Sequence, residues 1–210
     1  QGKMDDQFTT GDFYLNVFPS SRFPFLAHYI ESRDQFDSAS SQFDTETTEY
    51  GLSQQYRSEN GRHNYLAEYE NNQRDSSNRN SFASDSLLLS SDDRIGDHRL
   101  DTDLKLDTVD NTSTDERAEN YSITLDHFYG DTTNWSIENL LSTASAESDF
   151  SDSSNEIDTS QLASFASWHP RTNKDLKLTG SLRLTETRQD QQSDGIMATD
   201  AGKASRKRPT

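Results

Sequence analysis

The residues whose types could bind a metal ion gather near position 100. His98, Asp101, Asp103 and Asp107 combine an imidazole with three carboxylates, and both groups are common metal ligands. Polar and apolar residues alternate here, and successive side chains of a strand point to opposite faces. His98 would therefore lie on the apolar face and the three aspartates on the polar face. These side chains would not converge on one ion, and we expect neither a metal nor another cofactor.

Two acidic runs offer the oxygen ligands that Ca²⁺ prefers. Neither run has the glycine or the ligand spacing of a known calcium-binding loop, so solubility and mutual repulsion explain them better than a calcium site. Their members are Asp34, Asp37 and Asp44 in the first run, and Glu147, Asp149, Asp152, Glu156 and Asp158 in the second.

Catalytic chemistry finds no support in the residue pattern. The chain has no cysteine, which removes thiol nucleophiles, thiolate metal sites and disulfides. Serine, histidine and aspartate are plentiful, but no nucleophile elbow or comparable motif surrounds a serine. Asn111, Asn120 and Asn134 begin N-x-S/T sequons, which a chain rich in serine and threonine contains by chance. We therefore expect a protein that is not an enzyme.

The composition is acidic and poor in core-forming side chains. The formal net charge of −17 argues against nucleic-acid binding, because phosphate contacts require a basic surface. Leu, Ile, Val and Phe supply 37 of the 210 residues, and the mean hydropathy is −1.03. Such values are typical of a disordered acidic chain, or of a sheet that is apolar on one face only. No apolar run is long enough for a transmembrane helix.

The order of the residues favours the sheet. In the segment 160–188, Leu176, Leu178, Leu182 and Leu184 fall on one face of an extended chain, whereas Lys177 and Arg183 fall on the other. Comparable alternation recurs along the chain, and Asn60-Gly61 between two such runs is a strong hairpin signal. We predict an all-β, antiparallel up-and-down meander of about ten strands.

The connections between the predicted strands alternate in length. The expected short turns are 19–21, 58–62, 92–97, 130–133 and 169–173. The expected longer acidic stretches are 34–47, 71–80, 110–118, 147–159 and the residues beyond 188. Short turns at one end and longer loops at the other are typical of a transmembrane β-barrel. The predicted meander or barrel segment covers residues 12–188, between a disordered lead (1–11) and a disordered tail (189–210).

Three phrases carry a family resemblance: RFPF at Arg22–Phe25, LASFASWHP at Leu162–Pro170 and LKLTGSLRL at Leu176–Leu184. With the alternation, they make residues 13–188 resemble uncharacterised predicted outer-membrane β-barrel proteins of Gram-negative bacteria. The resemblance implies a porin-like cell-envelope protein, but it contains no catalytic motif from which functional residues could be carried over. The chain opens at Gln1 without a signal peptide and ends in SRKRPT, not in an aromatic-terminated strand, so we expect part of a larger barrel.

The barrel interpretation assigns the two faces. The side chains expected to face the lumen are Asp101, Asp103, Lys105, Asp107, Glu138, Lys177 and Arg183. Those expected to face lipid are Leu100, Leu104, Leu106, Ile123, Leu125, Leu176, Leu178, Leu182 and Leu184.

We therefore expect an outer-membrane protein that acts as a channel, export component or scaffold at the cell envelope. Its expected partners are outer-membrane lipid and other envelope proteins, and not nucleic acid. Two alternatives remain open at this point. One is a secreted or periplasmic β-rich protein that binds a ligand or polysaccharide, and the other is an acidic disordered segment.

Overall fold

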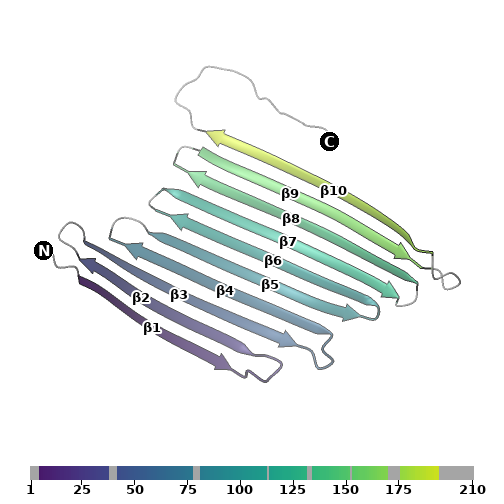
Figure 1. Ribbon diagram of the computed structural model, residues 1–210, viewed down its shortest axis with the longest axis horizontal. Helices are drawn as coiled ribbons and strands as arrows, with labels where there is room; N and C mark the ends of the chain where they lie inside the picture. Colours follow the sequence, from purple (N-terminus) through teal and green to yellow (C-terminus); the bar gives the residue numbers. More distant parts are fainter. Residues whose placement is uncertain are drawn as a thin grey trace, which may run out of the picture.

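A computed structural model describes residues 5–37, 42–77, 81–112, 114–131, 134–151, 153–169 and 176–193. These residues form ten β-strands, which confirms the predicted all-β meander (Figure 1). The strands are β1 (Asp5–Val17), β2 (Phe25–Asp37), β3 (Gln42–Arg57), β4 (His63–Ser76), β5 (Phe82–Ile95), β6 (His98–Asn111), β7 (Glu116–Asp131), β8 (Trp135–Phe150), β9 (Ser153–Trp168) and β10 (Leu178–Ser193).

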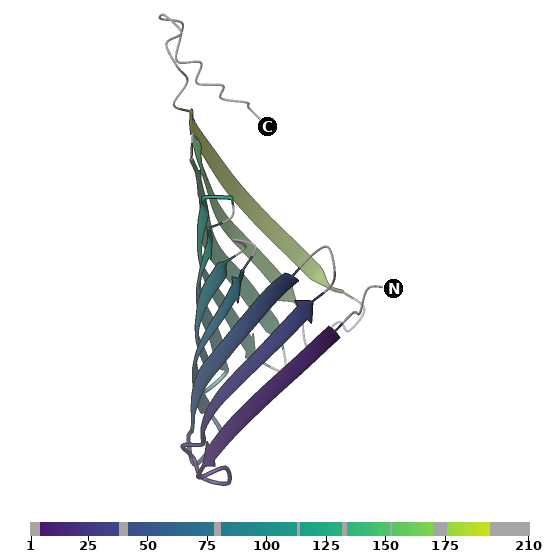
Figure 2. The ribbon, with the colours of Figure 1, turned by 90° about the vertical axis from the view of Figure 1, so that its left-hand side faces the viewer.

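All ten strands belong to one sheet, in which each strand pairs antiparallel with its neighbour in the sequence. The sheet is not closed: among the described residues, β1 pairs only with β2, and β10 only with β9. Seen from the side, the sheet is twisted and curved, so that the edge strands bend away from the central strands (Figure 2). Strand sterics impose a twist on an extended sheet of L-residues. Among the described residues no helix is long and apolar enough to cross a membrane.

The pairing register separates an apolar face from a polar face across the sheet. Leu125, Leu141, Leu162 and Leu184 lie opposite one another across β7 to β10. Shifting the register of a strand by one residue would move its side chains to the other face. The observed register therefore keeps the leucines of successive strands together, and the apolar face extends from β1 to β10.

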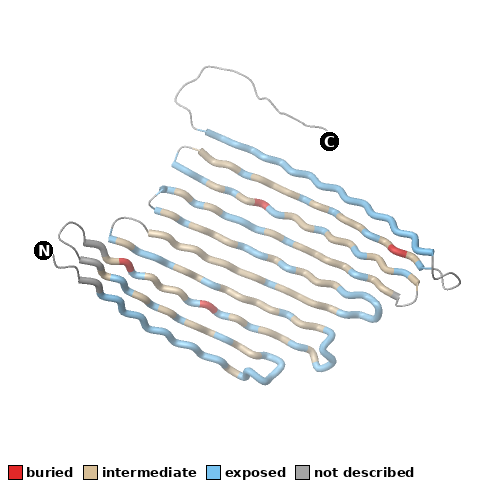
Figure 3. Tube along the Cα trace, in the orientation of Figure 1, coloured by how far each residue is buried: buried red, intermediate tan, exposed pale blue. Residues whose placement is uncertain are grey.

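The sheet is a single layer without a core. Among the described residues, no apolar side chain is buried, and the buried polar residues are Thr45, Ser145 and Ser167 (Figure 3). Large apolar side chains remain exposed to solvent: Leu141 is 51% exposed and Leu182 is 53% exposed. Backbone hydrogen bonds hold the strands together, but nothing in the described part of the chain covers the apolar face.

Two tight turns use glycine for its left-handed backbone. Gly61 has φ of +65° in the connection between β3 and β4, and Gly96 has φ of +62° between β5 and β6. The Gly61 amide donates to the Ser58 carbonyl at 3.0 Å, and the Arg62 amide donates to Oδ1 of Asn60 at 3.0 Å. This geometry confirms the hairpin that Asn60-Gly61 predicts.

The predicted alternation of short and long connections is wrong. At the end of the sheet where long loops were expected, only residues 38–41, 77–81, 112–115 and 151–152 separate the strands. At the other end the connections are 18–24, 58–62, 96–97, 132–134 and 169–177, several of them longer. The reason is that a backbone ladder satisfies N–H and C=O groups whatever the side chains are. Polar residues that resembled loops therefore extend the strands.

The meander also extends beyond its expected boundaries, because polar residues at both ends join the backbone ladder. Residues 5–11 and 189–193, expected to lie in the disordered lead and tail, pair within β1 and β10. Residues 1–4 and 194–210 lie outside the described residues. β10 also begins later than predicted, at Leu178, so Leu176 and Lys177 precede it and have no position in the ladder.

Candidate functional site: the charged face of the sheet

Acidic and basic side chains meet on the polar face near the turn between β5 and β6. Asp92, Asp101 and Asp126 lie directly opposite one another on β5, β6 and β7. Like charges opposite one another in a sheet repel, so this row is destabilising unless cations stand beside it. The next row places Arg94 and Arg99 side by side in β5 and β6.

Arg99 joins two of the three aspartates. Its Nη2 lies 3.3 Å from Oδ2 of Asp92, and its Nε lies 2.9 Å from Oδ2 of Asp101. Arg94 Nε forms an ion pair with Oδ1 of Asp92 at 3.4 Å without the direction of a hydrogen bond, and this buried oxygen accepts no hydrogen bond from the described residues. Asp126 forms neither kind of contact with any described residue. Of the three aspartates, Asp126 therefore has no counter-ion among the described residues.

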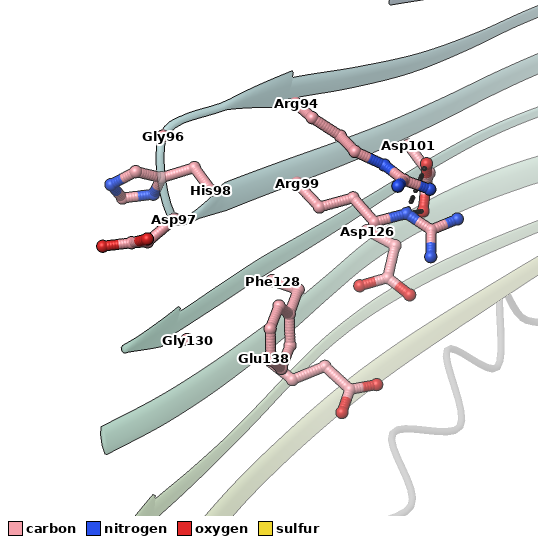
Figure 4. A pocket seen from close by; sticks show the side chains of 10 residues that line it. All are labelled: Arg94, Gly96, Asp97, His98, Arg99, Asp101, Asp126, Phe128, Gly130 and Glu138. Atoms are coloured by element: carbon pink, nitrogen blue, oxygen red, sulfur yellow. Dashed lines mark hydrogen bonds and ion pairs between the residues drawn. The ribbon is translucent and has the colours of Figure 1, made fainter. Parts of the chain in front are cut away.

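A shallow cavity of about 600 Å³ opens over this cluster (Figure 4). Two arginines and four carboxylates line it, and His98, Phe128 and the glycines Gly96 and Gly130 complete the wall. The charged lining residues are Arg94, Arg99, Asp97, Asp101, Asp126 and Glu138. The excess of carboxylates gives the cavity a negative potential, which attracts cationic solutes and repels anionic ones.

The remaining charged residues of the polar face are spread along the strands. In β6, Lys105 Nζ lies 2.8 Å from Oδ2 of Asp107, which also accepts a hydrogen bond from Ser86 Oγ at 2.8 Å. Asp103 lies between this pair and the cavity. In β10, Arg183 Nη2 donates to Oε1 of Gln161 at 3.1 Å.

Aromatic rings cover two glycines on the same polar face. A methyl group at Gly51 would lie 2.3 Å from Cε1 of His28, the residue opposite it in β2. A methyl group at Gly130 would lie 2.6 Å from Cε1 of Phe128. Tyr14 stacks on His28 with ring centroids 6.0 Å apart. These rings need a neighbour without a side chain, so the two glycines shape the polar face.

One ion pair lies at the hairpin end of β2 and β3, far from the apolar part of these strands. Arg33 Nη2 lies 2.5 Å from Oδ2 of Asp44, and Arg33 Nε donates to Oδ1 at 3.1 Å. This two-point contact holds the pKa of the Asp44 carboxyl below its usual range, against a weaker opposing effect of desolvation.

The predicted site residues divide into three groups. Asp101 and Glu138 meet in one cavity, and Asp103, Lys105, Asp107 and Arg183 share its face at a distance. Lys177 lies outside β10. On the other face, the register groups Leu100, Leu104, Leu106, Ile123, Leu125, Leu178, Leu182 and Leu184, whereas Leu176 precedes the strand.

Sequence reasoning missed Asp92, Arg94, Arg99 and Asp126 as members of the charged cluster. Asp92 and Arg94 were expected in a turn, although both lie in β5. Arg99 carried a usable signal, because it alternates in phase with Asp101. Asp126 carried no such signal, since only the register between β6 and β7 places it beside Asp101.

Comparison with known proteins supports the architecture. No protein-family model and no curated protein matches the sequence. The solved siderophore receptor PirA from Pseudomonas aeruginosa matches with a TM-score of 0.61 at 12% identity, over 89% of this chain and 37% of the receptor chain. The outer membrane transporter YddB from Escherichia coli matches with a TM-score of 0.54 at 11% identity, over 88% of this chain and 34% of that chain.

This chain therefore spans little more than a third of the length of either protein. At such low identity the likeness concerns the fold alone. The ten described strands have the architecture of one sector of an outer-membrane β-barrel.

Proposed function

We propose that the chain forms a sector of an outer-membrane β-barrel through which small solutes pass. The apolar face lies against lipid, and the charged face lines a water-filled interior. The negative lining near Asp101 and Asp126 favours cationic solutes over anionic ones. The siderophore receptor and the transporter with the same fold support a role in passage, and an export or scaffold role would use the same two faces.

The observation that carries this proposal is the uncovered apolar face. Its side chains lie on one side of every strand, yet none of the described ones is buried. Fully burying a Leu or Phe side chain is worth about 1.5–3 kcal/mol, so leaving a whole sheet face in water forfeits most of the stability available to a domain. Contact with hydrocarbon removes that cost without a protein layer.

The length of the apolar band fits a membrane. On β7 the apolar-face side chains run from Tyr121 to Tyr129, which is eight residue steps, or about 27 Å along the strand. At a strand tilt of about 40° this corresponds to about 21 Å along the membrane normal, close to the ~25 Å band of outer-membrane barrels. The tyrosines at both ends suit the interfaces, where aromatic rings with a polar tip are favoured.

The two alternatives fare less well. The disordered segment is wrong for the described residues, because they form a continuous sheet. A secreted or periplasmic binding protein would need a second layer over the apolar face, and the described part of the chain contains none.

Refolding of the full chain into detergent and into lipid vesicles tests the proposal. We expect a sheet signal in far-ultraviolet circular dichroism and gel migration that changes on boiling. Trp135 and Trp168, whose ring centroids lie 5.8 Å apart on the apolar face, should lose fluorescence in vesicles of brominated lipid. A folded, monodisperse protein in plain buffer, with tryptophans that brominated lipid does not quench, would reject the membrane role in favour of a soluble binding protein.

A further inference from the structure

Two histidines meet on the apolar face near the turn between β5 and β6. His98 Nδ1 lies 3.0 Å from Nε2 of His127 on the neighbouring strand, and the rings stack with centroids 5.3 Å apart. Tyr129, which lies opposite His98, also packs against the His98 ring, with centroids 4.7 Å apart. His98 is exposed and is the first residue of β6, so water reaches the pair from the end of the sheet.

A directional chain of hydrogen bonds extends from this pair through two further contacts. Ser164 Oγ donates to Oδ1 of Asn139 at 2.7 Å, and Asn139 Nδ2 lies 3.3 Å from Nδ1 of His127. With neutral rings, Nδ1 of His127 accepts from Asn139, and its Nε2–H donates to Nδ1 of His98. The chain thus crosses β9, β8, β7 and β6 and fixes the orientation of the His127 ring.

We propose that His98 and His127 together bind a divalent transition-metal ion through Nδ1 and Nε2, with water completing the coordination. Imidazole is a preferred ligand of copper, nickel and zinc. No third His, Cys, Asp or Glu joins the two histidines within the part of the chain that the structure describes. His98 also lines the charged cavity, whereas His127 does not, and metal binding by the pair does not depend on solute passage through a barrel.

The spacing of the two nitrogens selects among these metals. With metal–nitrogen bonds of about 2.0–2.1 Å, a separation of 3.0 Å gives a nitrogen–metal–nitrogen angle of about 94°. Tetrahedral coordination would require a separation of about 3.3 Å, so the pair suits square-planar or tetragonal Cu²⁺ and Ni²⁺ better than Zn²⁺. A small rotation of the exposed His98 ring directs both lone pairs at one ion.

The neighbouring amide supplies the support that a metal-bound histidine needs. A histidine that binds a metal through one ring nitrogen usually donates its other N–H to a carbonyl or carboxylate. If the Asn139 side-chain amide turns over, its oxygen accepts from Nδ1–H of His127 and its NH₂ group donates to Ser164. Metal binding at Nε2 then reverses the hydrogen-bond chain without breaking it.

Copper titration of the full chain, refolded in detergent, tests the site. We expect one equivalent of Cu²⁺ with an electron paramagnetic resonance spectrum that shows two imidazole nitrogens. His98→Ala and His127→Ala should each reduce the spectrum to at most one imidazole nitrogen and weaken Cu²⁺ binding at least tenfold. His63→Ala is the matched control, because His63 lies on the same face but is bonded to Asp93 at 2.7 Å, and it should bind copper like the wild type.

The wild-type spectrum keeps the proposal testable even if a variant fails to fold. One imidazole nitrogen or none in the folded wild type would overturn the proposal, as would equal weakening in the His63 control. Ni²⁺ binding measured by calorimetry on the same samples should be weaker than Cu²⁺ binding but respond to the same two substitutions. Ni²⁺ binding that is unchanged by His98→Ala and His127→Ala would also contradict the proposal.

Discussion

Leu104→Arg is the substitution that most directly tests which face of the sheet lies against lipid. Leu104 lies in the middle of β6, opposite Ile123 in β7 and Leu89 in β5, and the apolar side chains of its strand run from Leu100 to Leu106. In a membrane this places Leu104 near the midplane, where an arginine on the lipid face costs about 2–4 kcal/mol. The folded-to-unfolded ratio should therefore fall about 30- to 700-fold, since about 1.4 kcal/mol corresponds to a factor of ten.

Asp103→Arg is the matched control, because it introduces the same side chain one residue away on the polar face. Its neighbours across the sheet are Ser90 and Thr124, which leave room for a solvated side chain, so we expect a change within about 0.5 kcal/mol. The assay is urea unfolding of the chain refolded into lipid vesicles, followed through the fluorescence of Trp135 and Trp168. Equal effects of the two substitutions, or a larger effect of Asp103→Arg, would refute the assignment of faces.

Three further predictions concern the polar face and the hairpin end. Gly51→Ala should destabilise the fold by about 1–3 kcal/mol in urea unfolding, because the added methyl meets the His28 ring, and His28→Ala in the same chain should restore most of the loss. Asp126→Asn should lower the preference for cations over anions in planar-bilayer conductance, because it removes a carboxylate without a counter-ion among the described residues. Arg33→Met should lower the melting temperature at neutral pH but not in strong acid, because the lowered pKa of Asp44 stabilises the fold only while that carboxylate is ionised.

Each of these predictions has a distinct outcome that contradicts it. Gly11 has no atom within 4 Å of a built methyl group, so Gly11→Ala should be nearly neutral, and a loss equal to that of Gly51→Ala would exclude the ring contact as the cause. Unchanged ion selectivity after Asp126→Asn would show that the cavity does not lie on the path of the solutes. The stability that ionised Asp44 adds should be fully present above the ordinary aspartate pKa of about 3.9. It should disappear as the pH falls through the lower pKa that Asp44 has in the folded protein. If the melting temperatures of the wild type and Arg33→Met still differ in strong acid, the ion pair with Asp44 is not the cause of the difference.

The charged cluster shows how far sequence reasoning reaches toward a site. Alternation correctly placed Asp101, Asp103, Lys105 and Asp107 on one face of one strand, because side-chain direction in a strand depends only on position along the chain. It could not place Asp126 next to Asp101, because that contact depends on the register between two strands. The pairing of His98 with His127 was hidden for the same reason.

The strand ends show a second limit. Polar stretches such as residues 42–47 and 153–159 have the composition of loops, yet they lie in β3 and β9. Once the first residues of a hairpin pair, each further pair of residues satisfies its backbone groups in the ladder while water solvates the side chains. Side-chain polarity therefore marks where the apolar band ends and does not mark where the strand ends.

By itself, the sequence determined the class of the fold and the existence of two chemically different faces. Both follow from a period of two residues, which is a local property of the extended chain. Tertiary structure alone decided the strand boundaries, the row of Asp92, Asp101 and Asp126, the rings over the glycines and the histidine pair. These features depend on which residue of one strand lies opposite which residue of the next. That register is set by the turns and by the matching of the apolar faces of two strands, and alternation along a single strand does not reveal it.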